Sequence, residues 1–314
     1  MKRLVVMVLV VLMSLSACLC AQAAELKWGS VHPETQAVTQ MMMRAIEEIN
    51  ANAEDVHITG YPNGVLGGSS DLVEGVQEGF VEIITEGPAQ FSAWIPKAAQ
   101  VEAPYLWQSV EHMHKATNGG YKDTLNELFE SINVRILGTF YYGTRQLTAN
   151  KPINTLADLE GMKIRVPQSD LYVKMIESWG ASATPMNINE LYMALQTGTV
   201  DGQENPLTTY YSYKFYEVVK YVILTDHIIC PNMIFINGDV WNSMSEHDQQ
   251  VVQAAVDSAI QWQDEQILAS EETLAEELKE YGVEIITPDN TIREATIPYI
   301  QPLIEDWDYI QSMA

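Results

Sequence analysis

The first third of the chain after residue 24 alternates between strand-like and helical hydrophobic patterns. A strand is predicted over residues 25–28, and an amphipathic helix over residues 35–51, where apolar side chains recur three and four positions apart. A second strand at 56–61 is followed by a loop at 66–71 that opens a further helix, and a third strand covers 81–85. Because helices and strands alternate, the pattern predicts an α/β fold with a largely parallel sheet and helices on both faces.

The same alternation returns after residue 131. Residues 134–148 show an unusually long strand pattern, long enough to leave one lobe and enter another. A short helix is predicted at 155–160, a strand at 163–166, and helices near 170–179 and 188–197. The chain is long enough for two lobes with separate cores.

One helical pattern near the C-terminus is much longer than the others. It runs over residues 246–281 and stops at Gly282, a residue suited to a helix end. At 1.5 Å per residue such a helix is about 50 Å long, which is more than one small domain needs. We therefore expect it to span both lobes.

The N-terminal segment has the features of an export signal. A charged start and an apolar stretch at residues 4–15 precede small residues at 21–23. We predict a signal peptide over residues 1–24 and a periplasmic protein. The alternative is a lipoprotein-processing site that would leave Cys18 lipidated, and cleavage near residue 23 is favoured over it.

Charge narrows the classes of partner. The formal net charge is −25, which argues against nucleic acid and against anionic membrane surfaces. An anionic ligand can then bind only through local cations held away from water. Five arginines follow the leader, and two of them, Arg145 and Arg165, lie on strand patterns about twenty residues apart. Within residues 162–166 the apolar side chains alternate with Lys163 and Arg165, so the arginine is expected on the face opposite the buried one.

The two arginines and a nearby amide point to carboxylate binding. A guanidinium offers a carboxylate two parallel hydrogen bonds, which a lysine cannot do. Asn205 would add an amide for a neighbouring hydroxyl or carbonyl group. For Arg165 alone, a surface or structural ion pair is the alternative, and the sequence by itself does not bring Arg145 beside it.

Three further residues are candidate ligand contacts, each with a structural alternative. His32 sits in a turn, where it either reaches a ligand or caps the chain. Glu86 follows a strand in apolar surroundings, where it either accepts a ligand hydroxyl or has a structural role. Tyr210 belongs to an aromatic run at 208–216, which either packs in a core or forms a platform for a ligand.

No catalytic or cofactor motif stands out. The sequence has no nucleophile elbow, phosphate loop or zinc-binding helix motif, so neither a cofactor nor a metal is expected. His112 and His114 are two positions apart and do not share a helix face. Cys230 is the one cysteine after the leader and is expected to be a buried structural thiol. An exported hydrolase acting on acidic sugars stays open as an alternative class, although no carboxylate pair is singled out for it.

Several motifs together resemble the substrate-binding proteins of tripartite ATP-independent periplasmic (TRAP) transporters. The motifs are Tyr142–Gln146, Gly161–Pro167, Thr184–Met186, Ala194–Pro206 and Lys214–Val218, and the similarity covers essentially the whole chain after the leader. The resemblance implies two α/β lobes around a cleft, spanned by the long helix. Lobe I would consist of residues 25–142 and 231–270, and lobe II of residues 143–230 and 271–314.

The resemblance also implies a function and roles for individual residues. Arg165 would bind a ligand carboxylate through both of its terminal nitrogens, and Arg145 and Asn205 would bond to the same group. Glu86 lies near a position at which a relative holds ligand hydroxyls. The protein would be a non-enzymatic receptor that captures an organic acid and hands it to the membrane subunits of a transporter.

The segment after residue 186 narrows the ligand. Sialic-acid-binding members carry an aromatic residue there, whereas this chain has Asn187 and Asn189, which disfavours sialic acid. The added amides favour a smaller polar ligand such as a uronic or aldonic acid, and Gln168 is included among the candidate contacts. A C4-dicarboxylate, a hydroxy or keto acid and an aromatic acid remain open.

Overall fold

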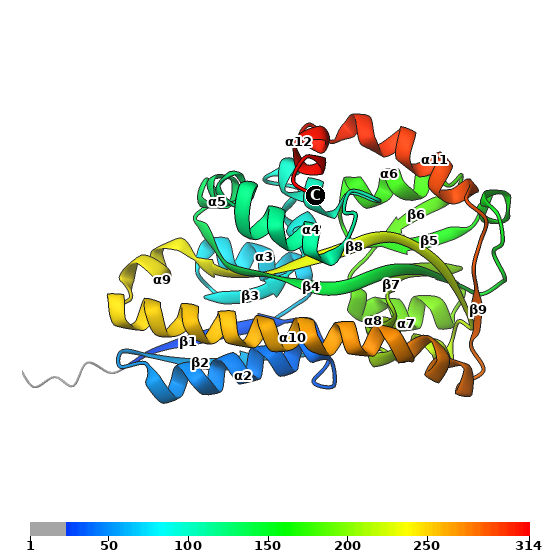
Figure 1. Cartoon of the computed structure of the whole chain (residues 1–314). Helices are drawn as coiled ribbons and strands as arrows, with labels where there is room; N and C mark the ends of the chain where they lie inside the picture. Colours follow the sequence, from blue (N-terminus) through cyan, green and yellow to red (C-terminus); the bar gives the residue numbers. More distant parts are fainter. Residues whose placement is uncertain (1–22) are drawn as a thin grey trace, which may run out of the picture.

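In the part of the chain that the structure describes, one mixed sheet runs from one end of the molecule to the other (Figure 1). The computed structural model describes residues 23–314, apart from the side chain of residue 272. Within this part of the chain the strand order is β2-β1-β3-β8-β4-β7-β5-β6, and β9 pairs with β8. The strands are β1 (Ala24–Ser30), β2 (Val56–Tyr61), β3 (Ile83–Glu86), β4 (Val134–Ala149), β5 (Lys163–Val166), β6 (Ser182–Pro185), β7 (Gly202–Pro206), β8 (Tyr221–Asn237) and β9 (Glu284–Ile286).

Two long central strands join two lobes. Strands β1, β2 and β3 are parallel and form the sheet of lobe I, and β5 runs parallel to β6 and β7 in lobe II. Strands β4 and β8 lie between these groups and pair antiparallel from Val134 and Asn237 to Ala149 and Tyr221. The prediction of a largely parallel sheet therefore holds inside each lobe and is wrong for the strands that connect the lobes.

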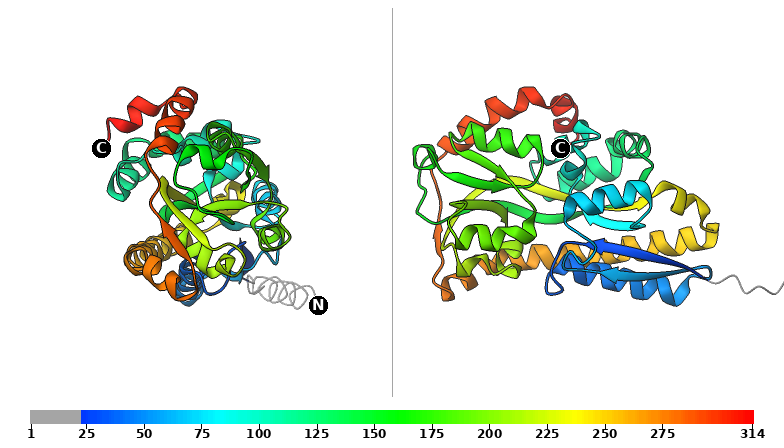
Figure 2. Two further views of the ribbon diagram at one scale, coloured as in Figure 1. Left: turned by 90° about the vertical axis from the view of Figure 1, so that its right-hand side faces the viewer. Right: turned by 180° about the vertical axis from the view of Figure 1, so that it is seen from behind.

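Helices cover both faces of this sheet (Figure 2). They are α2 (Ala37–Asn52), α3 (Ser69–Glu78), α4 (Val110–Lys115), α5 (Lys122–Glu130), α6 (Asp170–Ser178), α7 (Ile188–Gln196), α8 (Leu207–Ser212), α9 (Gly238–Ser243), α10 (Glu246–Glu280), α11 (Thr291–Ile300) and α12 (Trp307–Gln311). Helix α10 has 35 residues and packs against α2, β4 and α8, so it contacts both lobes as the sequence predicts. None of the helices in the described part of the chain combines the length and apolarity required to cross a membrane.

Helix α10 also holds an irregularity in β4 that shapes the cleft. The register of β4 against β8 shifts between Tyr141 and Gly143, where the glycine has a φ of +126°. Asp264 accepts a hydrogen bond from the Tyr141 N–H at 2.7 Å, and Glu271 accepts one from the Thr144 N–H at 2.6 Å. A bulge of this kind re-aims a side chain. Here the side chain of Tyr142 lines the cleft between the lobes.

Candidate ligand-binding cleft

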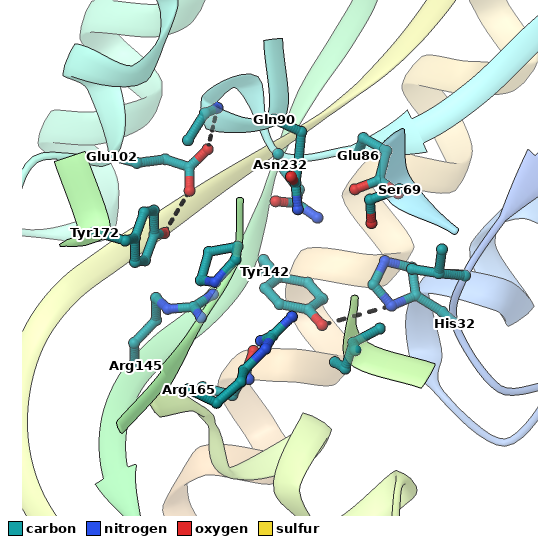
Figure 3. A pocket seen from close by; sticks show the side chains of 16 residues that line it. His32, Ser69, Glu86, Gln90, Glu102, Tyr142, Arg145, Arg165, Tyr172 and Asn232 are labelled. Atoms are coloured by element: carbon teal, nitrogen blue, oxygen red, sulfur yellow. Dashed lines mark hydrogen bonds between the residues drawn. The ribbon is translucent and has the colours of Figure 1, made fainter. Parts of the chain in front are cut away.

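A pocket lies where the carboxyl ends of the lobe I strands face lobe II (Figure 3). Crevices at this edge of an α/β sheet are the usual place for ligands. The polar side chains that line the pocket are His32, Ser69, Glu86, Gln90, Glu102, Tyr142, Arg145, Arg165, Tyr172, Asn205 and Asn232. The structure thus brings together five of the residues that the sequence singles out: Arg145, Arg165, Asn205, His32 and Glu86.

Arg165 presents a buried cation to the pocket. It lies on β5 and is only 3% exposed. Its Nε and Nη2 both donate to the carbonyl oxygen of Met186, at 3.0 and 2.7 Å. Burial lowers the pKa of Arg165 to about 10, which still leaves the side chain charged at neutral pH. Among residues 23–314 it has neither a carboxylate partner nor a hydrogen-bond partner for Nη1, so this nitrogen is available to an anion.

Arg145 differs from Arg165 because its charge is already matched. Its Nε and Nη2 lie 2.6 and 2.8 Å from the two carboxylate oxygens of Glu204, which is fully buried on β7. His227 Nε2 lies 3.0 Å from the same carboxylate. Burial by itself would raise the pKa of Glu204, but the charge of Arg145 and the hydrogen bonds from His227 and Arg145 together outweigh it, so the net pKa is lowered. The sequence does not identify this partner, and hydrogen bonding of Arg145 to a ligand stays a prediction.

Lobe I lines the opposite side of the pocket with Glu86 and His32. Burial raises the pKa of Glu86 from its usual 4.5 to about 8, and the nearby Ser69 hydroxyl only partly offsets this effect. Burial likewise lowers the pKa of His32 to about 4, so its ring is neutral at pH 7. Glu86 Oε1 and His32 Nε2 are both buried without a hydrogen-bond partner in the described structure. Unpaired buried polar atoms are rare in proteins, and here both belong to side chains that line a pocket.

Several lining residues escape the sequence analysis. Glu102 accepts hydrogen bonds from the Ala89 N–H, at 2.7 Å, and from the Tyr172 hydroxyl. A Cβ atom at Gly87 would lie 2.8 Å from Glu102 Oε1, so a glycine is needed beside it. Nothing in the local sequence marks Glu102 or Tyr172. Ser69, by contrast, stands in the loop predicted at 66–71, and the position of this loop after a parallel strand is a signal that could have found it.

The remaining predicted contacts lie at the rim of the cleft or outside it. Gln168 accepts a hydrogen bond from Ser70 at 3.1 Å, which ties lobe II to lobe I. The Asn187 side chain lies beside the backbone of Gly68, also across the two lobes. Neither Gln168 nor Asn187 lines the pocket. Tyr210 is fully buried in the core and donates to the Val219 carbonyl at 2.7 Å, so its prediction as a ligand contact is wrong. Phe215 of the same aromatic run is also buried, whereas the Tyr213 hydroxyl donates to the Val31 carbonyl of lobe I at 2.8 Å.

Three other predictions concern His112, His114 and Cys230. His112 is buried, with Nε2 2.9 Å from the carbonyl of Ile310, whereas His114 Nε2 lies 3.0 Å from Asp264. The two rings therefore have separate partners. Cys230 is a buried free thiol, as predicted.

The close contact of Gly68 with Asn187 predicts an effect on ligand affinity. A Cβ atom at Gly68 would lie 2.8 Å from the Asn187 side chain. Gly68→Ala should therefore prop the lobes apart and weaken ligand binding by about fivefold, at the low end of the usual penalty for overpacking. Adding Asn187→Ala removes the obstructing side chain and should restore binding in calorimetry. Unchanged affinity of the single variant would show that the rim contact plays no part in closure.

The raised pKa of Glu86 predicts an unusual pH dependence of stability. A carboxyl whose folded pKa lies above its unfolded pKa contributes stability below the unfolded pKa, near 4.5, and loses it as the pH rises towards about 8. Glu86→Gln should therefore raise the free energy of unfolding at pH 8 by about 1–3 kcal/mol. One pKa unit corresponds to 1.36 kcal/mol. The expected gain is smaller than the full pKa shift of Glu86 would give, because opening of the lobes rehydrates part of the charge. Urea unfolding at pH 5 and pH 8 measures this gain. Glu127→Gln, on the exposed side of α5, is the matched control and should change neither value.

Comparisons with known proteins identify the family of this chain. The family model described as bacterial extracellular solute-binding protein, family 7, matches residues 26–309. The chain belongs to this family. Proteins of the family are solute receptors of TRAP transporters, which work with membrane permease subunits and are not enzymes. The resemblance inferred from the motifs is thereby confirmed.

Individual relatives match over nearly the full length of this receptor. The chain is 32% identical to the sialic acid-binding periplasmic protein SiaP of Vibrio cholerae, over 95% of this chain and 93% of that protein. A TRAP periplasmic solute-binding protein of Roseobacter denitrificans with bound L-galactonate superposes with a TM-score of 0.89, at 31% identity, covering 93% of this chain and 99% of the other. A second, from Xanthobacter autotrophicus with bound β-D-galacturonate, gives a TM-score of 0.85 at 28% identity, covering 92% and 97%.

The family is periplasmic. The predicted signal peptide at residues 1–24, with its alternative lipidation site at Cys18, lies almost wholly outside the described residues.

Proposed function

We propose that this TRAP receptor binds a sugar acid, either an aldonate or a uronate, and delivers it unchanged to the membrane subunits of its transporter. The observation that carries the proposal is Arg165, a buried cation with a free nitrogen in the cleft and no carboxylate partner in the described structure. An uncompensated buried charge is costly for a protein. A ligand carboxylate supplies the missing partner. The bound L-galactonate and β-D-galacturonate of the two solved relatives support this ligand class.

In this proposal the ligand bridges the two lobes. Its carboxylate bonds to Arg165 and to the amide of Asn205, while the hydroxyls reach His32 and Glu86 on lobe I. Ligand contacts on both sides stabilise the closed arrangement over the open one, which is how a two-lobed receptor signals that it is occupied. The lobes divide as residues 25–142 with 231–270 and 143–230 with 271–314.

Export of the receptor is part of the same proposal. Residues 1–24 act as a signal peptide that is cleaved near residue 23. Mass spectrometry of the exported protein tests this point, because cleavage before a lipidated Cys18 would give a different mass and a membrane-bound product.

A thermal-shift screen of the protein tests the proposed ligand class. The protein is refolded from denaturant first, so that a ligand carried through purification is removed. An aldonate or uronate at 100 times its dissociation constant should add about 2.7 kcal/mol to the free energy of unfolding, whereas neutral sugars should add nothing. A shift only with aromatic acids or C4-dicarboxylates would overturn the sugar-acid assignment. Chemical change of the recovered ligand would favour the hydrolase alternative.

A further inference from the structure

The two walls of the cleft carry opposite kinds of charge. Lobe II supplies both arginines of the lining, and one of them, Arg145, is neutralised by Glu204. Lobe I supplies the carboxyl groups Glu86 and Glu102, and none of its lysines or arginines in the described part of the chain lines the pocket. Among residues 23–314, the cleft therefore offers a single free cation, Arg165, on one wall only.

Glu86 is fixed at the lobe I end and faces the pocket. It is the last residue of β3, where it pairs with Met233 of β8. It is 3% exposed, and its Oε1 has no hydrogen-bond partner in the part of the chain that the structure describes. Figure 3 shows Glu86 and Ser69 on one side of the pocket and Arg165 on the other.

The polar and charged groups around Glu86 do not compensate a second anion. They are Ser69 at the start of α3, Glu102 on the 3₁₀ helix Pro96–Glu102, Arg165 on β5, Tyr213 after α8, and the neutral ring of His32 after β1. Arg165 is the one cation among them, and it is the group to which the ligand carboxylate binds in the proposed function.

We propose that Glu86 makes the lobe I end of the cleft a site for an uncharged ligand oxygen, so that this receptor accepts acids with one carboxylate and rejects the dicarboxylates of the same carbon chain. This inference rests on the proposed function. It names Glu86 as the residue that sets specificity, and it selects monocarboxylates from the ligand classes that the sequence leaves open.

The chemistry of the two ligand ends explains the selection. A hydroxyl both donates and accepts, so it can bond to Glu86 in either protonation state. A second carboxylate would meet the carboxyl of Glu86 in a buried site, where two neighbouring carboxylates cannot both stay ionised. It would also leave one negative charge without a partner away from water. Repulsion of the wrong ligand contributes to specificity as much as attraction of the right one.

Calorimetry with matched ligand pairs tests the inference. The pairs are gluconate with glucarate, galactonate with galactarate, and mannonate with mannarate, because each pair differs only in the group at one end of the chain. At pH 9, above the raised pKa of Glu86 of about 8, this carboxyl is ionised while Arg165 is still charged. For the pair whose aldonate binds best at this pH, we expect the aldarate to bind at least about 100-fold more weakly, since like charges brought together in an interface cost several kcal/mol. Equal affinities within a pair would overturn the inference.

The variant Glu86→Gln assigns the selection to one side chain. We expect this variant to bind the aldonate more weakly and the aldarate more tightly, because an amide can donate to a second carboxylate. The ratio of the two affinities should therefore narrow to about tenfold. Glu127→Gln, at an exposed position that does not line the pocket, should leave the ratio of the two affinities at its wild-type value. An unchanged ratio in Glu86→Gln would overturn the role of this residue, and its folding is checked by the same urea titration used for stability.

The outcomes separate the inference from the function on which it rests. If the aldonate and the aldarate of a pair both bind well, the sugar-acid function stands and the selection by Glu86 fails. If no aldonate or uronate binds to the refolded protein, the proposed function fails and takes the inference with it.

Discussion

Replacing Glu204 with glutamine should lower the free energy of unfolding by about 3–5 kcal/mol. Glu204 is fully buried and bonds to both Nε and Nη2 of Arg145, itself 5% exposed. Removing one partner of such a pair leaves the other charge buried and unmatched, which accounts for a loss of this size. The amide keeps the volume of the side chain, so the effect reports on charge.

Urea unfolding at pH 7 measures the change. The control is Glu276→Gln, which removes an exposed ion pair of similar length, with Lys279 at 2.6 Å. Exposed pairs contribute about 0–1 kcal/mol, so the control should be nearly neutral. Equal losses in the two variants would show that burial does not set the strength of the Glu204 pair.

The same pair also predicts part of the acid sensitivity. The folded pKa of Glu204 is lowered, so the stability that it contributes is present above its unfolded pKa and is lost as the pH falls through the folded value. In Glu204→Gln, this part of the loss of stability at low pH should be absent.

Arg165→Ala should weaken sugar-acid binding by about 2–5 kcal/mol, the range for removing one member of a buried, hydrogen-bonded charge pair. Arg165 is 3% exposed and holds its guanidinium against the Met186 carbonyl, so it is already oriented before a ligand arrives. Orientation in advance reduces the loss of side-chain freedom on binding. Calorimetry with the best ligand of the screen measures the change.

Two further variants define what Arg165 provides. Arg165→Lys keeps the charge but loses the planar fork, so we expect it to bind more weakly than wild type. Arg44→Ala removes an exposed arginine on α2, outside the pocket, and should bind as wild type does. If lysine at position 165 binds as well as arginine, the site recognises charge without geometry.

The elements with a clear hydrophobic period could be predicted from the sequence. Strands β2 and β5 have the expected bounds, and helix α10 ends one residue before the predicted end. Strand β8 could not be predicted, because its 17 residues are buried along most of their length and show no alternation. Its antiparallel pairing with β4 is a property of the assembled sheet.

Some features of the candidate site could likewise be predicted from the sequence, and others could not. Glu86 ends β3 and His32 follows β1, and this position at the carboxyl edge of a sheet is visible in the pattern. The partner of Arg145 is not visible, because Glu204 lies 59 positions away and meets it only through the pairing of β4 with β7. Periodicity placed Arg165 on the correct strand. The family motifs, and not the spacing, implied that the two arginines share one cleft.

A crystal structure of the refolded protein with the sugar acid that stabilises it most is the most direct test of the central claim. We predict the ligand carboxylate within about 2.7–2.9 Å of the Arg165 guanidinium, the distance of a charge-assisted hydrogen bond, with ligand hydroxyls beside Glu86 and His32. A carboxylate bound on the lobe I wall, or a sugar acid that leaves Arg165 bonded only to the Met186 carbonyl, would contradict the account.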